Sequence, residues 1–154
     1  MPLTADDFAV GQDYVVACTV ATEVPPTPTT NFSAEMIVLA IRAVCDVIRN
    51  RVADAAFPNT AVEVVLQPRQ FSAVCHDEYW RKALAGKWFP RHVASCLAAW
   101  RYVVAPPVVP GALWYFSPIS MEPPGREPTW LAGKEEIIVP KLNPHYFRFF
   151  KEAP

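Results

Sequence analysis

Hydrophobic residues recur every three or four positions through the first two thirds of the chain, which is the spacing of one helix face. Turn and capping residues divide this part into segments, so several helices are expected rather than one long helix. The expected helices run from Thr4 or Asp13 to about Thr22, from a cap at Asn31 or Ser33 to about Val52, from a cap at Thr60 through Leu66, from Glu78 to Gly86, and from Pro90 to about Val104. Within the second helix we expect Arg42, Arg49 and Arg51 on or near the surface.

The pattern changes in the last third, where short apolar runs alternate with glycine and proline. Such runs between turn residues are typical of strands. Three are expected, at 112–116, 136–139 and 146–150. Helices followed by a small, antiparallel sheet give an α+β fold, and 154 residues fit a single domain covering 1–154.

Composition narrows the classes of function. Hydrophobic residues make up 52% of the chain, which indicates a globular protein with a real core. A net charge of −1 gives no field that would attract nucleic acid or an anionic membrane, so neither is an expected partner. No stretch approaches a membrane span, and residues 1–12 lack the basic and apolar regions of a signal peptide. We therefore expect synthesis in the cytoplasm without a signal peptide and no stable membrane insertion.

The four cysteines do not suggest a metal centre, because no two of them form a C-x-x-C pair. Cys18, Cys45 and Cys96 lie in apolar helical patterns and are expected to be small buried thiols. Cys75 and His76 could suggest a metal ligand or a nucleophile, although a loop or helix start is the better interpretation. No metal or cofactor is predicted.

Glu23 is the carboxylate of most interest. It follows an apolar helix and precedes Val24 and Pro25, where an acid can be partly buried at the edge of a cleft. Burial raises a carboxyl pKa and keeps the group protonated, as a general acid requires. On position alone, a solvated glutamate at a helix end is the better interpretation. Glu35 competes for the role, but an acid in a first helical turn suits the helix dipole.

Polar residues follow the apolar segment 61–66. Gln67, Gln70 and Ser72 can donate and accept hydrogen bonds, as sugar hydroxyls and N-acetyl amides require, and Phe71 lies among them. A polar loop that caps its own backbone explains them about equally well. Further candidates for sugar contacts are the aromatic residues Trp114, Tyr115 and Trp130, although aromatic rings in a short strand more often belong to the core. The last candidates are His145 and Tyr146, although a lone histidine is more often structural.

Taken together, these residues resemble the SleB-like cell wall hydrolases, which comprise spore-cortex-lytic enzymes and their phage and proteobacterial relatives. The matching segments, in the family's order, are 47–52, 57–60, 64–65 with 70–72, 111–116, Trp130 and 145–148. The family's single catalytic glutamate ends the first helix in a segment of the type A-R-x-I-Y-x-E-A, which residues 17–24 match. The resemblance therefore places the catalytic glutamate at Glu23.

The resemblance implies a lysozyme-like domain that cleaves peptidoglycan glycan strands between N-acetylmuramic acid and N-acetylglucosamine, as a lytic transglycosylase without a cofactor. It implies that glycan is bound by Gln67, Gln70, Phe71, Ser72, Tyr115, Trp130, His145 and Tyr146. Because the sequence shows no signal peptide or wall-anchoring repeat, we expect a phage or prophage endolysin that a holin releases to the host cell wall in the periplasm, or a virion-associated lysin.

Two other functions stay open. A plain hydrolytic muramidase would use the same substrate. A glycan-binding or structural module with the same fold would have lost catalysis, which the departure after Glu23 would explain: a long proline-rich stretch, 25–31, replaces the family's short Gly-Glu-Pro loop. The chain also has Tyr115 and Phe116 at the family's tyrosine–histidine position.

Overall fold

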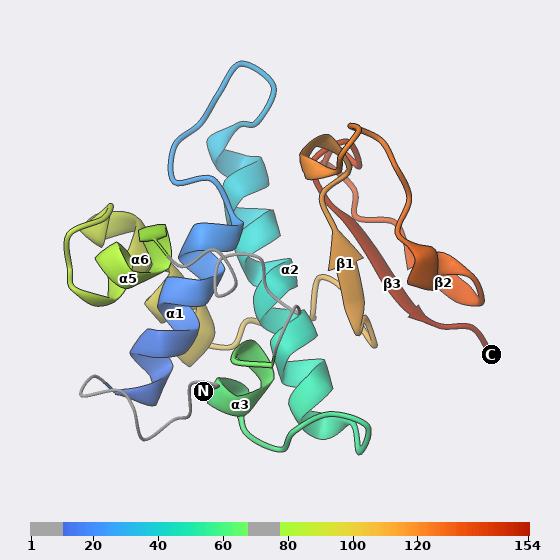
Figure 1. Cartoon of the computed structure of the whole chain (residues 1–154), viewed down its shortest axis with the longest axis horizontal. Helices are drawn as coiled ribbons and strands as arrows, with labels where there is room; N and C mark the ends of the chain where they lie inside the picture. Colours follow the sequence, from blue (N-terminus) through green and yellow to red (C-terminus); the bar gives the residue numbers. More distant parts are fainter. Residues whose placement is uncertain (1–10, 68–77) are drawn as a thin grey trace.

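The computed structural model describes residues 11–67 and 78–154 of the chain (Figure 1). The helices in this part are α1 Gln12–Glu23, α2 Ala34–Ala53, α3 Ala61–Val65, α5 Glu78–Leu84 and α6 Pro90–Arg101. The strands are β1 Trp114–Phe116, β2 Lys134–Ile137 and β3 Arg148–Glu152, with 3-10 turns η2 at Pro118–Ser120 and η3 at Thr129–Leu131. The expected α+β order, helices first and strands last, is confirmed.

Side-chain caps begin two of the helices as the sequence predicts. The Ser33 hydroxyl accepts a hydrogen bond from the Met36 amide at 3.2 Å, so Ser33 rather than Asn31 caps α2. The Thr60 hydroxyl accepts from the Glu63 amide at 3.3 Å and caps α3. α1 begins at Gln12, close to the later of its two expected starts; the earlier start, Thr4, lies outside the described residues.

The last helix is shorter than predicted and ends at Arg101, not near Val104. A helix continued to Val104 would need amide donors from residues 106 and 107 for the carbonyls of Tyr102 and Val103, and both of those residues are prolines. The apolar residues from Tyr102 to Val104 suggested a longer helix, but they lie beyond the end of α6 and are exposed.

The strands form one antiparallel sheet in the order β1-β3-β2. Strands β2 and β3 differ from the predicted ranges, 136–139 and 146–150. Each strand includes charged residues that lie outside the apolar run from which it was predicted. Lys134 pairs with Glu152, and their side chains form an ion pair at 3.3 Å. The apolar centre of each strand was therefore predicted better than its ends.

The two faces of the sheet carry different side chains, because cross-strand partners share a face and neighbours along a strand alternate. Tyr115 pairs with Phe149 and lies on the face that we call the inner face. Phe116 and Phe150 lie on the other, which we call the outer face. In Figure 1, α2 lies between β1 and the group formed by α5 and α6.

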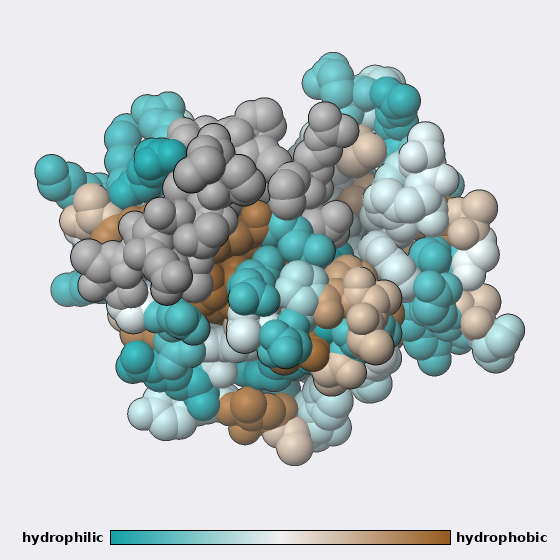
Figure 2. Space-filling model, turned by 60° about the horizontal axis from the view of Figure 1, so that its bottom comes forward, coloured by the Kyte–Doolittle hydropathy of each residue, from teal (hydrophilic) through white to brown (hydrophobic). Residues whose placement is uncertain are grey.

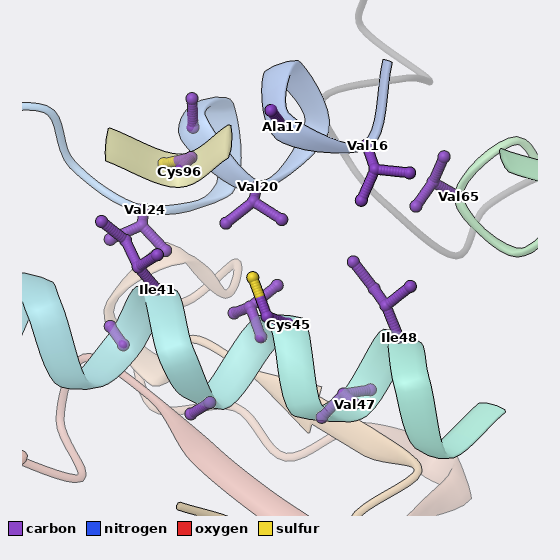
Figure 3. Packing of buried hydrophobic residues seen from close by; sticks show 14 of the residues in the cluster. Val16, Ala17, Val20, Val24, Ile41, Cys45, Val47, Ile48, Val65 and Cys96 are labelled. Atoms are coloured by element: carbon purple, nitrogen blue, oxygen red, sulfur yellow. The ribbon is translucent and has the colours of Figure 1, made fainter. Parts of the chain in front are cut away.

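The core is built around α1, whose residues from Val15 to Ala21 are all at most 1% exposed. A helix that is apolar all round must be covered on every side, and α1 packs against α2, α3, α5 and α6. Figure 3 shows Val16 and Val20 of α1 directed toward Ile48 and neighbouring residues of α2. Burial of this helix holds its C-terminal residue, Glu23, at a defined place.

The buried thiols are confirmed for the cysteines that the structure describes. Cys18, Cys45 and Cys96 are free and fully buried, and they come from α1, α2 and α6 respectively. Burial raises the pKa of Cys18 and Cys45 to about 12, so both stay protonated at neutral pH. Cys75 and His76 lie outside the described residues.

The prediction that Arg51 lies near the surface is wrong, because its side chain is 3% exposed. Arg51 follows Val47 by four residues and therefore continues the buried face of α2. Its Nε atom donates to the Leu113 carbonyl at 2.7 Å, and its guanidinium lies 5.1 Å from the Phe57 ring centre. By contrast, Arg42 and Arg49 are only half-buried, as expected of side chains near the surface.

On the face shown in Figure 2, hydrophilic and hydrophobic residues are interspersed over the part that the structure describes. None of the described helices is both long enough and apolar enough to cross a membrane.

Candidate active site

Glu23 is the last residue of α1 and is half-buried, as expected for an acid at the edge of a cleft. The Val24 amide donates to the Val20 carbonyl at 3.1 Å and closes the helix immediately after it. The Tyr115 hydroxyl of β1 donates to Glu23 Oε2 at 3.2 Å. The carboxylate at the end of the first helix therefore meets a phenol from the first strand, 92 residues later in the chain.

Tyr115 is held in place by its neighbours on the inner face. Its ring stacks on Phe149 with ring centres 5.7 Å apart and lies 6.2 Å from the ring of Phe147. Burial raises the pKa of Tyr115 well above its usual value, and the Glu23 carboxylate acts in the same direction, while the Arg51 guanidinium lowers it. Tyr115 is therefore protonated at neutral pH and can donate to Glu23.

Asn50 and Arg51 of α2 fix the chain that leads into β1. Asn50 Nδ2 donates to the carbonyls of Ala112 at 2.9 Å and Val109 at 3.3 Å. Arg51 Nε donates to the carbonyl of Leu113. Because Tyr115 follows two residues later, these bonds decide where its hydroxyl lies relative to Glu23.

Asp46, one turn earlier in α2, holds the preceding part of the same loop. It is 7% exposed, and its Oδ2 atom accepts hydrogen bonds from the amides of Val108 at 2.6 Å and Val109 at 3.3 Å. Arg49 lies 3.4 Å from Asp46 Oδ1 and also donates to the carbonyls of Ala99 and Trp100 at the end of α6. This carboxylate is occupied by backbone donors and serves the loop structure.

His92 of α6 is a residue of the site that the sequence analysis missed. It is 9% exposed, and its Nε2 atom lies 3.1 Å from the carbonyl oxygen of Val24, the residue after Glu23. Burial lowers the pKa of His92, while its backbone hydrogen bonds to Val24 and Ala21 raise it. Its spacing in the sequence gave one signal, since His92 precedes buried Cys96 by four residues on the apolar face of α6.

The proline-rich segment 25–31 returns to the core at Phe32, which is 1% exposed. Phe32 meets the ring of Tyr146 edge to face, with ring centres 4.7 Å apart, and lies 6.2 Å from Phe147. Phe147 in turn contacts Tyr115, so a row of aromatic rings joins the segment after Glu23 to the inner face of the sheet. Of the predicted glycan contacts, Tyr115 and Tyr146 both belong to this row.

His145 lies at the edge of this row, whereas Trp130 lies apart from it. His145 is exposed, its ring meets that of Tyr146 edge to face with ring centres 5.7 Å apart, and its amide donates to Asn143 Oδ1 at 2.9 Å. Trp130 packs on Phe116 and Phe150, with ring centres 6.0 Å and 5.8 Å away, and so lies on the outer face of the sheet. The structure does not bring Trp130 together with Glu23 and Tyr115.

Gln67 is half-buried at the end of the α3 region, and its Oε1 atom is buried without a hydrogen-bond partner among residues 11–67 and 78–154. Its amide group can both donate and accept hydrogen bonds. The other predicted glycan contacts of this stretch, Gln70, Phe71 and Ser72, lie outside the described residues.

Glu35, the alternative catalytic acid, lies at the surface. Its side chain is 62% exposed and pairs with Lys141 at 3.3 Å, which is the geometry of a surface ion pair. Residues 11–67 and 78–154 contain no group of three or more histidine, cysteine, aspartate or glutamate side chains that could hold a metal ion.

The chain belongs to the Cell Wall Hydrolase family, whose model matches residues 38–148. The match covers well over half of the chain and includes Asn50, Arg51 and Tyr115, whereas Glu23 lies before its start. Membership of a SleB-like cell wall hydrolase family, expected from the sequence, is confirmed.

The fold is similar to that of the catalytic domain of the germination-specific lytic transglycosylase SleB from Bacillus anthracis. The two share 24% identity with a TM-score of 0.62, and the alignment covers 96% of this chain and 100% of the other. At this identity the similarity establishes the fold, and it includes the α1 region that the family model leaves out. No curated protein sequence matches the chain significantly.

Proposed function

We propose that this protein cleaves the glycan strands of peptidoglycan and that Glu23 is its catalytic acid. The observation that carries the proposal is the hydrogen bond of 3.2 Å from the Tyr115 hydroxyl to Glu23 Oε2. It joins a half-buried carboxyl group at the end of a helix to a half-buried donor on the sheet. Membership of the Cell Wall Hydrolase family gives the substrate class, the bacterial cell wall.

In the proposed reaction, protonated Glu23 gives its proton to the glycosidic oxygen between N-acetylmuramic acid and N-acetylglucosamine, and the bond from that oxygen to the muramyl anomeric carbon breaks. The carboxylate then takes the proton of the muramyl 6-hydroxyl, whose oxygen bonds to the same carbon and leaves a 1,6-anhydro end. Glu23 finishes protonated, so one carboxyl group serves as acid and then base. Ordinary glycosidases use two carboxyl groups.

Tyr115 would assist this cycle through Glu23. Its hydroxyl hydrogen bond favours the ionised carboxylate, which is the form that exists between the two proton transfers. Because Tyr115 stays protonated, it keeps the same donor role through both steps. The bond also restricts rotation of the carboxyl group, so that its proton is presented in one direction.

For the glycan, we propose contacts by Gln67, Tyr146 and His145 among the described residues. Gln67 carries an amide that can both donate and accept hydrogen bonds, which suits an N-acetyl group. Gln70, Phe71 and Ser72 stay proposed contacts from the sequence. Trp130 would contact glycan only where the strand extends to the outer face of the sheet.

The biological role that we propose is that of a phage or prophage endolysin, made in the cytoplasm and released to the peptidoglycan by a holin. This rests on the resemblance to phage members of the family. Expression in bacteria with and without a co-expressed holin tests it. Lysis that requires the holin supports the role, and lysis without a holin contradicts it.

The test of the catalytic proposal is turbidity loss of purified peptidoglycan with wild type, Glu23→Gln and Glu35→Gln. Glu23→Gln keeps the size of the side chain and removes the acid, so activity falls by about 10²–10⁴-fold. Glu35→Gln, the matched control, loses only a surface ion pair and keeps its activity. Loss of activity in Glu35→Gln instead would transfer the assignment, and an inactive wild type would favour the binding module.

A further inference from the structure

The carbonyl groups at the end of α1 have few backbone donors. The last four carbonyls of a helix have no partner within it and are usually satisfied by amides just beyond the C-terminus or by nearby cationic side chains. Here the two residues after Val24 are Pro25 and Pro26, which have no amide hydrogen. The last turn of α1 contains no basic residue. The Val24 amide is already bonded to the Val20 carbonyl.

His92 of α6 supplies a side-chain donor to the carbonyl of Val24, just beyond this helix end. Its Nε2 atom is 3.1 Å from the Val24 carbonyl oxygen. Since a carbonyl oxygen only accepts, Nε2 must carry the proton. The Ala21 backbone, in the last turn of α1, also acts on this ring by raising its pKa. The imidazole thus binds the backbone immediately after Glu23.

The imidazole itself is held in one orientation. The Trp88 ring meets it edge on, with ring centres 6.4 Å apart, and Cys96 Sγ lies 4.0 Å from Nε2. Val24 is 1% exposed, and in Figure 3 its side chain lies next to Ile41 of α2. Helices α2 and α6 therefore fix the residue that follows Glu23 through its side chain and its carbonyl respectively.

We propose that His92 is a positioning residue for Glu23: its Nε2 donates to the Val24 carbonyl at the helix end, where Pro25 and Pro26 provide no capping amides, and so sets the direction of the catalytic carboxyl group. The proposal rests on the function proposed above. It also accounts for how the chain keeps Glu23 in place before the proline-rich segment 25–31. A displacement of about 1 Å in a catalytic group can cost up to ~10²-fold in rate, so a backbone contact beside Glu23 is large enough to matter.

The test compares His92→Met with His92→Gln. The two side chains have the same length, but only glutamine has a donor near the position of Nε2. Val93→Ala is the matched control, because it removes buried methyl groups from the same helix without changing a side-chain hydrogen bond. We expect His92→Met to lower kcat by about 10-fold or more, with KM within about 2-fold of wild type. We expect kcat per folded molecule of His92→Gln and Val93→Ala to stay within about 3-fold of wild type.

Equal kcat in folded His92→Met and His92→Gln would overturn the proposal. If His92→Met does not fold, a 10-fold loss of kcat in folded His92→Gln would overturn it too. Hydrogen exchange of the Val24 amide gives a readout without activity: it should be faster in His92→Met than in His92→Gln. An inactive, folded wild type would contradict the proposed function alone, and equal exchange in the two variants would contradict the role of His92 alone.

Discussion

Both faces of the sheet carry aromatic rings, yet they differ in what those rings meet. On the inner face, Tyr115 packs on Phe149 and directs its hydroxyl to Glu23 of α1. On the outer face, Phe116 and Phe150 stack on each other and on Trp130. Both faces come from the same short strands, so aromatic content alone cannot identify the site. The polar partner that a ring reaches distinguishes the two faces.

Charge is also distributed differently on the two faces. Arg148 lies over Phe116 and Phe150 on the outer face and pairs with Glu136 at 2.6 Å and with Glu127 at 3.6 Å. These charged side chains pair with one another within the face. The inner face also carries an ion pair, Lys151 with Glu135 at 3.8 Å, but in addition it presents the Tyr115 phenol to the Glu23 carboxyl group of another element. The inner face thus differs from the outer face in this contact between a hydroxyl and a carboxyl group.

Tyr115→Phe should have the largest effect of the substitutions in the sheet. It keeps the ring stacked on Phe149 and removes the hydroxyl that donates to Glu23. A hydrogen bond to a charged group contributes about 1.5–3 kcal/mol, so kcat on peptidoglycan should fall by roughly 10–100-fold. The melting temperature should change by only a few degrees. Unchanged kcat would show that the inner face does not support Glu23.

Asn50→Ala should affect both stability and activity. It removes two hydrogen bonds that hold the chain before β1, and a loss of about 1–3 kcal/mol in the free energy of unfolding is expected. Because the same chain places Tyr115, kcat per folded molecule should also fall, by less than in Tyr115→Phe. Denaturant unfolding and kinetics on the same samples check both effects. A normal kcat in a destabilised protein would separate this loop from the site.

Trp130→Ala should affect stability without changing catalysis. The ring is half-buried against Phe116 and Phe150, so its removal should cost roughly 1–3 kcal/mol, below the range for a fully buried tryptophan. Turnover per folded molecule should stay within about 3-fold of wild type. Weaker glycan binding by a fully stable variant would contradict the contrast between the faces and support the sequence-based prediction that Trp130 binds glycan.

The smallest effect concerns pH and the helical side of the site. Burial lowers the pKa of His92 below its value in the unfolded chain, so the unfolded state binds a proton first as pH falls. The contribution of the neutral, buried His92 to the free energy of unfolding is therefore complete above about pH 6.5 and is lost as pH falls through the folded pKa. Cys96, the thiol that contacts the ring, stays protonated throughout because burial raises its pKa.

Melting temperatures of wild type and His92→Gln between pH 5 and pH 8 measure this effect. The wild type should lose more stability toward pH 5 than the variant does. Equal pH dependence of the two proteins would show that His92 does not titrate differently on folding.

The parts of this structure that local sequence patterns specify were predicted well. Ser33 and Thr60 cap α2 and α3 because a capping side chain acts within three residues of itself. The apolar spacing around Val44 and Val47 also gave the extent of α2 correctly. The place of Glu23 at a helix end could be predicted too, although the catalytic role proposed for it came from the resemblance to a family.

The contacts that complete the site could not be predicted, because they join residues far apart in the chain. Tyr115 reaches Glu23 across 92 residues, and His92 reaches Val24 across 68. Arg51 was assigned to the surface from its charge, although its position continues the buried face of α2 and its partner, Leu113, is 62 residues away. Burial of a polar group depends on such distant partners, which helical spacing alone does not reveal.

The most direct test of the account is mass spectrometry of glycan products from wild type and Glu23→Gln. The account predicts that wild type releases muropeptides with 1,6-anhydro ends, each lighter by one water than the hydrolytic product, and that folded Glu23→Gln releases at least ~10²-fold less. Products with reducing ends would identify a hydrolytic muramidase at the same site. Wild-type yields of anhydro product from Glu23→Gln would contradict the central claim that Glu23 is the catalytic acid.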